Sequence, residues 1–175
     1  MMNLIIYDRG NIMNANIRKE LLKIIEKNSK IEVRDLSKML EVSEVDILNE
    51  LSELEKEHII CGYLTLIDWE KTDSEKVTGL IEVRVTPQRG QGFDKIAERI
   101  YNYEEVSSVY LISGAYDLLV TLEESSLKEI AKFVAEKLST IDAVISTATH
   151  FILKKYKDHG IIFNNKHEDE REALS

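Results

Sequence analysis

The sequence contains a single cysteine, Cys61, so no disulfide can form within the chain and no cysteine-rich metal cluster is available. A lone cysteine fits a reducing compartment, and we expect its thiol to be buried and inert. One proline and seven glycines leave little material for turn-rich coil. Most of the 175 residues should therefore lie in helices and strands.

Positive charge and long apolar runs are also scarce. The chain has 23 basic and 32 acidic residues, and its net charge of −9 argues against non-specific attraction to nucleic acid or anionic lipid, although a local basic face remains compatible with it. Its apolar stretches fall short of the roughly 20 residues that cross a bilayer, and its first residues lack the features of a secretory signal. We expect a cytoplasmic protein with no membrane partner.

Apolar residues at helical spacing predict three helices in the first part of the chain, over 14–28, 33–40 and 44–58. Ser43 is a suitable N-cap for the third helix, and acidic residues follow it where the helix dipole favours negative charge. Three helices with a tight turn between the second and third predict a helix-turn-helix. A strand-like run over 58–68 would supply the wing and the linker.

The remainder of the chain changes to an alternating rhythm. It predicts four strands over 77–86, 106–113, 116–122 and 143–153, and two helices over 93–101 and 127–138. The order βαββαβ is that of a ferredoxin-like fold, in which both helices cover one face of the sheet. We expect a second subunit to cover the other face. The fold class is thus α+β, with an N-terminal winged helix-turn-helix and a C-terminal ferredoxin-like domain.

These patterns divide the chain into five parts. We expect an N-terminal extension (1–13), a winged helix-turn-helix (14–63), a linker (64–76), a βαββαβ domain (77–154) and a charged tail (155–175).

Three segments carry a resemblance to a known family. They are the junction Leu-Glu-Lys-Glu-His-Ile-Ile-Cys-Gly-Tyr over 54–63, the Gly-x-Tyr-Asp hairpin within 109–120, and Ser-Thr-Ala-Thr over 146–149. Together they make residues 14–155 resemble the Lrp/AsnC, or feast/famine, transcriptional regulators. The resemblance implies a DNA-binding regulator with a RAM-type ligand-sensing and oligomerisation domain. It further implies a homo-oligomer, from a dimer up to an octamer, and an effector such as an amino acid at the interface between dimers.

The resemblance also implies where the effector binds. Carried over to this chain, the polar pocket comprises Ser113, Gly114, Tyr116, Asp117, Thr147 and Thr149. A glycine leaves room for a ligand, a tyrosine offers a hydroxyl and an aromatic wall, and a carboxylate accepts from an ammonium group. The alternative is that a tight hairpin alone accounts for Gly114 and Asp117.

The third helix fits DNA less well. Family members usually carry arginines where this chain has Leu48, Asn49 and Glu50, and the helix has six acidic residues against one lysine. Asn49 can still hydrogen-bond adenine and Glu50 can accept from cytosine. The remaining candidate DNA contacts are Lys19, Lys23, Arg34 and Lys38 on the first two helices, and Ser43 and Asp46 at the start of the third. The alternative is a small-molecule-binding or protein-interaction module whose acidic helix-turn-helix does not bind DNA.

Catalytic motifs are missing from the sequence. It contains no Walker loop, no Gly-x-Ser-x-Gly and no His-Glu-x-x-His. Some tetrapyrrole decarboxylases share this two-part architecture, and His150 and His159 are the residues that would serve such an enzyme. We expect no enzymatic activity, no cofactor and no metal.

Overall fold

The computed structural model describes residues 13–74, 76–86, 92–124 and 126–163, in two compact units whose boundary falls between Leu66 and Ile67. Three segments lie outside the described residues: 1–12 of the expected extension (1–13), most of the loop after the first predicted strand (87–91) and the end of the charged tail (164–175). The two units are described separately below.

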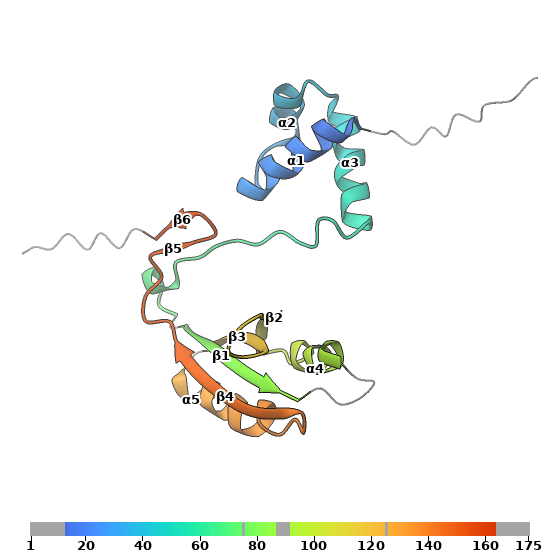
Figure 1. Cartoon of the computed structure of the whole chain (residues 1–175). Helices are drawn as coiled ribbons and strands as arrows, with labels where there is room; N and C mark the ends of the chain where they lie inside the picture. The colour runs from blue at the N-terminus through green and yellow to red at the C-terminus, as the bar shows by residue number, and fades with distance from the viewer. Residues whose placement is uncertain (1–12, 75, 87–91, 125, 164–175) are drawn as a thin grey trace, which may run out of the picture. The chain divides into compact units, whose positions relative to one another are not determined.

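The N-terminal unit is built on three helices, as predicted: α1 (Ala15–Lys27), α2 (Val33–Leu40) and α3 (Glu44–Lys56) (Figure 1). Each helix contributes at least one fully buried apolar side chain to a common core, which contains Leu21, Leu36, Ile47 and Leu54. Burying each such side chain contributes roughly 1.5–3 kcal/mol. The apolar stripes that predicted the helices are therefore also what holds them together.

The turn between α2 and α3 is set by local hydrogen bonds. Glu41 ends α2 in the left-handed conformation, with φ of 54°, and the Val42 amide donates back to the Ser37 carbonyl. Ser43 then caps α3: its Oγ accepts from the Asp46 amide at 3.2 Å and its hydroxyl donates to the Asp46 carboxylate at 2.7 Å. This reciprocal cap gives the helix-turn-helix its tight corner.

The segment after α3 differs from the prediction. Residues 61–68 have no strand assignment, because this stretch finds no partner strand among the described residues. Tyr63 is half exposed and Leu64 is almost wholly exposed. Cys61 is also exposed rather than buried, so the expectation of a buried thiol was wrong.

The C-terminal unit contains the predicted βαββαβ fold. Its sheet has the order β2-β3-β1-β4, with all neighbours antiparallel, and consists of β1 (Val77–Val85), β2 (Val106–Leu111), β3 (Leu118–Glu124) and β4 (Val144–Phe151). The helices are α4 (Gly92–Tyr101) and α5 (Leu127–Phe133), and α5 continues into a π-helical turn (Val134–Leu138).

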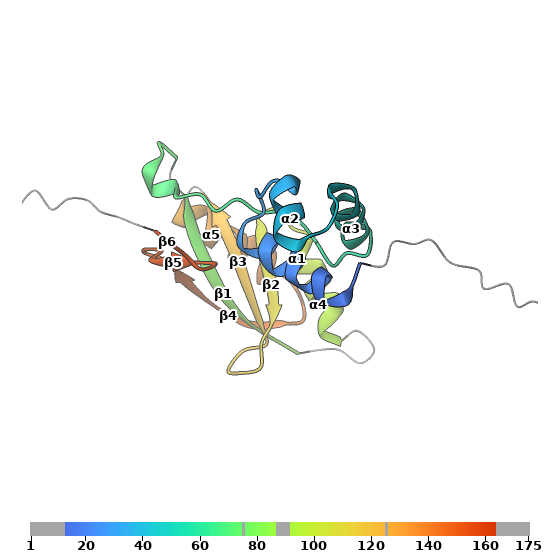
Figure 2. The same cartoon turned by 90° about the horizontal axis from the view of Figure 1, so that it is seen from above.

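Both helices of this unit cover the same face of the sheet (Figure 1). Ile100 of α4 and Ile130 of α5 are fully buried in one cluster with the alternate strand residues Ile81 and Val120. Figure 2 views the sheet from the side that these helices leave open. Apolar and polar residues alternate along the strands, as predicted, because one face of the sheet lies in the core and the other face lies outside it.

Two small elements flank the sheet. A 3₁₀ turn (Trp69–Lys71) precedes β1, and a hairpin of β5 (Lys157–Asp158) and β6 (Ile161–Ile162) follows β4. The segment predicted to be a charged tail (155–175) thus includes a short hairpin. His159 and Gly160, both with positive φ, form the two-residue connection of this hairpin.

Candidate functional site

The outward face of α3 has apolar and amide side chains at its centre, with the exposed acidic residues Glu44, Glu53 and Glu55 at its borders. Val45 is 65% exposed and Leu48 is 54% exposed, and Asn49 is exposed beside them. Their spacing of i, i+3 and i+4 places them on one side of the helix. The opposite side, with Ile47 and Leu54, is buried in the core.

Glu50 does not lie on this outward face. It is 5% exposed, and its Oε1 lies 3.0 Å from Nε of Arg18 on α1. Arg18 also forms an ion pair with Glu57 just beyond the end of α3. The expectation that Glu50 accepts from cytosine was wrong, because its carboxylate is turned into the unit against Arg18.

Other acidic groups of α3 are also held by neighbours. Glu53 lies 2.6 Å from the Lys56 ammonium, and Glu55 accepts a hydrogen bond of 2.9 Å from the Tyr63 hydroxyl. Partial burial, followed by this bond to Glu55, raises the pKa of Tyr63. Asp46 is engaged by the Ser43 cap. These contacts engage the acidic groups, while Glu53 and Glu55 remain exposed beside the Val45, Leu48 and Asn49 face.

The basic residues expected at phosphates lie on the surface of α1 and α2. Lys19 and Arg34 are exposed, as are Lys23 and Lys38. Lys23 lies 2.6 Å from Glu20 and, mainly through that hydrogen bond, holds the pKa of the Glu20 carboxyl below its usual value. Lys38 lies 3.4 Å from Asp35. The two expected residues at the start of α3, Ser43 and Asp46, are used in the helix cap.

The loop between β2 and β3, residues 112–117, brings four of the six expected effector residues together: Ser113, Gly114, Tyr116 and Asp117. The Ile112 amide donates to the Asp117 carbonyl at 2.8 Å, which closes the loop. The loop is longer than predicted, since β2 ends at Leu111 and β3 begins at Leu118. Oδ2 of Asp117 accepts from the Val85 amide at 2.8 Å, where the β1–β4 register shifts. Asp117 thus has a structural role in β1.

Gly114 is not required by the geometry of a single chain. It lies outside the left-handed region, and a Cβ added to it would meet only Cγ2 of Ile112, at 3.7 Å. The tight-turn explanation therefore does not account for this glycine.

Thr147 and Thr149 lie apart from the loop. They pair with Val83 and Ile81, which are fully buried under the helices, so the threonines lie on the helix-covered face of the sheet. The edge strand β4 is separated from β3 by β1, a distance of about 10 Å. One chain does not bring all six expected residues into a single site.

His150 lies on the open face of the sheet. Its Nε2 lies 3.3 Å from Oε1 of Glu82 on the neighbouring strand, so a cross-strand pair accounts for this histidine. The described residues contain no group of three or more histidine, cysteine, aspartate or glutamate side chains placed to hold a metal. Within the same residues, every helix is too short or too polar to cross a membrane.

Solved structures match this fold over most of the chain. A transcriptional regulator of Neisseria meningitidis in complex with L-methionine superposes with a TM-score of 0.66 at 20% identity, over 90% of this chain and 99% of that one. AsnC of E. coli superposes with a TM-score of 0.61 at 19% identity, over 82% and 95%. These likenesses support the helix-turn-helix plus RAM-type architecture.

Sequence comparison gives the family. The Lrp/AsnC ligand-binding domain model matches residues 78–162. The uncharacterised HTH-type transcriptional regulator YugG of Bacillus subtilis is 47% identical over 157 residues, which are 89% of this chain and 95% of that protein. The leucine-responsive regulatory protein of Haemophilus influenzae is 26% identical over 138 residues, 79% and 82% of the two chains. The similar proteins are regulators rather than enzymes, and this chain belongs to the Lrp/AsnC family of HTH-type transcriptional regulators.

Proposed function

We propose that the chain regulates transcription in the cytoplasm by placing α3 in the major groove of DNA, with Val45, Leu48 and Asn49 facing the bases. The observation that carries this proposal is the division of α3 into two sides. The three outward side chains are exposed, whereas Glu50 and Glu57 are paired with Arg18. This pairing reduces the negative charge that α3 presents to DNA phosphates, although Glu44, Glu53 and Glu55 remain exposed.

The chemistry of the outward face favours A·T base pairs. An asparagine amide can bond to N6 and N7 of adenine, and apolar side chains contact the methyl group of thymine. Lys19, Lys23, Arg34 and Lys38 supply positive charge for the phosphates and carry no sequence information themselves. The residues that determine specificity are therefore Val45, Leu48 and Asn49, of which the sequence pattern indicated only Asn49.

Selection of bound duplexes from a random DNA pool by the full chain tests this function. We expect an enriched motif rich in A·T pairs, and we expect the Asn49→Ala chain to lose preference at one position of that motif. Asn102→Ala, which removes an exposed amide at the end of α4, is the matched control and should select the same motif as the unaltered chain. If the unaltered chain enriches no motif at low salt, the interaction-module alternative is preferred.

Two chains pair, in this proposal, through the open face of the C-terminal sheet, and the dimers assemble further. Leu80, Tyr110 and Leu119 lie on this face, at alternate positions to the buried strand residues. Tyr110 is 55% exposed in the single chain. Exposing a large aromatic side chain to water is unfavourable, so a partner that covers this face would stabilise it. Light scattering at micromolar concentration should give at least twice the monomer mass, and a folded monomer would contradict the assembly.

An amino acid or a similar small molecule binds at the loop 112–117, where two dimers meet, and changes the spacing of the DNA-binding units. Neither backbone conformation nor packing within one chain requires a glycine at position 114, and this supports a ligand site there. Two comparisons also support this site: the matching family model describes a ligand-binding domain, and the Neisseria meningitidis regulator was solved in complex with L-methionine. Gly114→Val should abolish any amino-acid-dependent change in mass or DNA affinity while leaving the melting temperature of the chain within a few degrees.

A further inference from the structure

A cavity lies at the end of the C-terminal sheet opposite the loop 112–117. It encloses about 410 Å³, and its walls come from the 3₁₀ turn, the start of β1, the ends of β3 and β4, and the segment that follows β4. Cavities of a few hundred Å³ that combine apolar walls with a few polar groups are typical ligand sites. Thr78 pairs with Glu123 at this end of the sheet, and Val83 pairs with Leu118 beside the loop 112–117. Five residues of strand, roughly 17 Å, separate the two ends.

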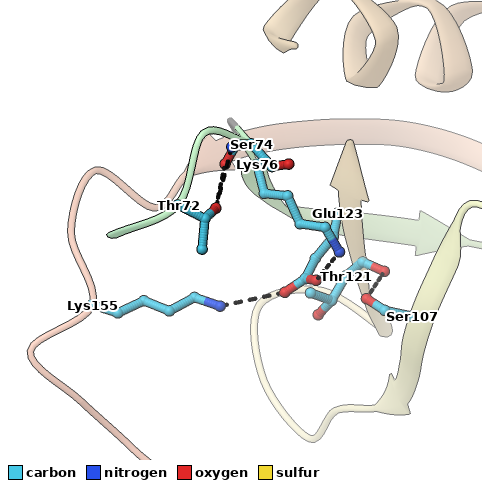
Figure 3. A network of polar contacts seen from close by, with 7 residues as sticks. All are labelled: Thr72, Ser74, Lys76, Ser107, Thr121, Glu123 and Lys155. Carbon is cyan, nitrogen blue, oxygen red and sulfur yellow. Dashed lines mark hydrogen bonds and ion pairs between the residues drawn. The ribbon is translucent and has the colours of Figure 1, made fainter. Parts of the chain in front are cut away.

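The cavity lining carries both signs of charge: the acidic residues Asp68, Glu70 and Glu123, and the lysines Lys76, Lys154 and Lys155. Asp68 lies 2.8 Å from the Lys71 ammonium. The Glu123 carboxylate lies between two ammonium groups, 3.3 Å from that of Lys155 and 3.7 Å from that of Lys76 (Figure 3). All three side chains are about one-third exposed, so water and small solutes reach them. Around Glu123, one carboxylate between two ammonium groups leaves a local excess of positive charge, which suits one anionic group of a ligand.

The hydroxyl side chains of the cavity contribute less to such a contact. Oγ1 of Thr72 accepts from the Ser74 amide at 3.2 Å and donates to the Trp69 carbonyl at 2.9 Å (Figure 3 shows the Thr72–Ser74 contact). These bonds hold the 3₁₀ turn in place beside the sheet. The ammonium groups of Lys76 and Lys155 are therefore the donors best placed for an anion.

An apolar wall adjoins the charged group. Trp69, Ile152 and Phe163 line the cavity, and the Lys76 ammonium lies 4.3 Å from the centre of the Trp69 ring. A carboxylate bound to Lys155 and Lys76 would place its hydrocarbon part against these side chains. Drawing Lys76 toward the ligand would also change the environment of the indole, because the cation now lies over its face.

We propose that this cavity binds a small organic acid, with the carboxylate at Lys76 and Lys155 and an apolar body against Trp69. This site is separate from the loop 112–117 and does not depend on DNA binding. Glu123 acts there as an internal competitor that occupies both ammonium groups when the ligand is absent. The segment after β4, which the sequence predicted to be part of a charged tail, supplies one wall of the site.

Trp69 is the only tryptophan in the chain, so its fluorescence reports on this cavity directly. The test is a titration of the full chain with three probes of the same shape that do not absorb at the excitation wavelength: 3-methylpentanoate, L-isoleucine and 2-methylbutylamine. We expect saturable changes with the two carboxylates and none with the amine. Equal responses to all three, or a response to the amine alone, would overturn the proposal.

Two substitutions with opposite effects make the test independent of stability. Lys155→Met should raise the dissociation constant for 3-methylpentanoate about tenfold or more, because it removes a charge-assisted contact. Glu123→Gln should lower the same constant, because it removes the competing carboxylate. Lys157→Met, on β5 and outside the cavity lining, is the matched control and should change nothing. A weakening by Glu123→Gln, or an equal effect of Lys157→Met, would overturn the proposal.

The titration also separates this site from the effector loop. Gly114→Val should leave the Trp69 response unchanged even where it abolishes an amino-acid effect on DNA binding. If Gly114→Val removes the fluorescence response, the ligand binds at the loop and this cavity is not its site. If the Trp69 fluorescence response is retained while no DNA motif is selected, ligand binding in this cavity is supported and the proposed DNA-binding function is contradicted.

Discussion

Arg18 of α1 places its Nε 3.0 Å from the buried Oε1 of Glu50 on α3, and its guanidinium also pairs with Glu57. A carboxylate that is only 5% exposed would be costly without a cation beside it. The pair joins the first and third helices at a place where the core offers only apolar side chains. It also turns one acidic group of α3, Glu50, away from the outward face.

Replacing Arg18 should therefore destabilise the N-terminal unit. Arg18→Met leaves Glu50 buried without its cation, and we expect the free energy of unfolding to fall by about 2 kcal/mol. Urea denaturation followed by circular dichroism measures this. Lys23→Met breaks an exposed pair with Glu20 and should change the same quantity by less than about 0.5 kcal/mol. Adding Glu50→Leu to Arg18→Met should restore stability, and equal losses in the two single variants would contradict this role of Arg18.

Gly79 lets α5 pack closely on β1. A Cβ at this position would lie 3.0 Å from Cγ2 and 3.1 Å from Cδ1 of Ile130, a fully buried side chain. Gly79→Ala should cost about 1–3 kcal/mol, because the helix must shift to relieve the contact. In a double-mutant cycle with Ile130→Ala, the cost of Gly79→Ala should largely disappear. Additive effects of the two substitutions would contradict this explanation of the glycine.

The ion pair of Glu105 and Lys137 should give stability a defined pH dependence. The hydrogen bond from Lys137 holds the pKa of the Glu105 carboxyl below its usual value of 4.5, and it raises the pKa of the Lys137 ammonium above 10.5. The contribution of the pair is therefore complete between these two pH values. It is lost as the pH falls through the lowered pKa of Glu105, and also as the pH rises through the raised pKa of Lys137.

Thermal unfolding of Lys137→Met across this pH range measures that contribution. The difference in melting temperature from the unaltered chain should be largest near neutral pH and should shrink at pH 3. Lys132→Met is the control on the same helix, because its ion pair with Glu136 is longer, at 3.9 Å, and exposed at both ends. A difference for Lys137→Met that is constant with pH would mean that the lysine acts through packing on Tyr103 rather than through its charge.

The regular elements were predictable because their cause is local. Apolar spacing over 14–28 and alternation over 77–86 gave α1 and β1 to within one or two residues, since one face of each is buried in a core. The β5–β6 hairpin was missed because its strands have two residues each. Its signal was the His159-Gly160 pair between Asp158 and Ile161, a dipeptide suited to a tight hairpin.

The site was less predictable because it depends on contacts between distant residues. Glu50 is charged and was expected to be outside, and nothing in its own helix indicates Arg18, 32 positions earlier, as its partner. Burial of Glu50 in turn defines which residues of α3 face outward. Thr147 and Thr149 were grouped with the loop by the resemblance, yet the sheet order places β1 between them and β3.

Contacts to thymine methyl groups can be tested by changing the DNA alone. Uracil in place of thymine removes only the C5-methyl group, so the hydrogen bonds of the base pair are kept. For the selected motif, we expect each contacted methyl to contribute about 0.8 kcal/mol, or roughly fourfold in affinity. The loss should be smaller for Leu48→Ser, which lacks the apolar contact. An equal loss in both proteins would indicate that Leu48 does not face the thymine.

The most direct test of DNA recognition by the outward face of α3 uses the Asn49→Ala chain. Its affinity for the selected motif is compared with its affinity for a shuffled duplex of the same composition. Fluorescence anisotropy at fixed salt gives both dissociation constants. We predict that the unaltered chain prefers the motif and that Asn49→Ala loses about 1–3 kcal/mol of that preference, with little change on the shuffled duplex. An unchanged preference in Asn49→Ala would contradict the account.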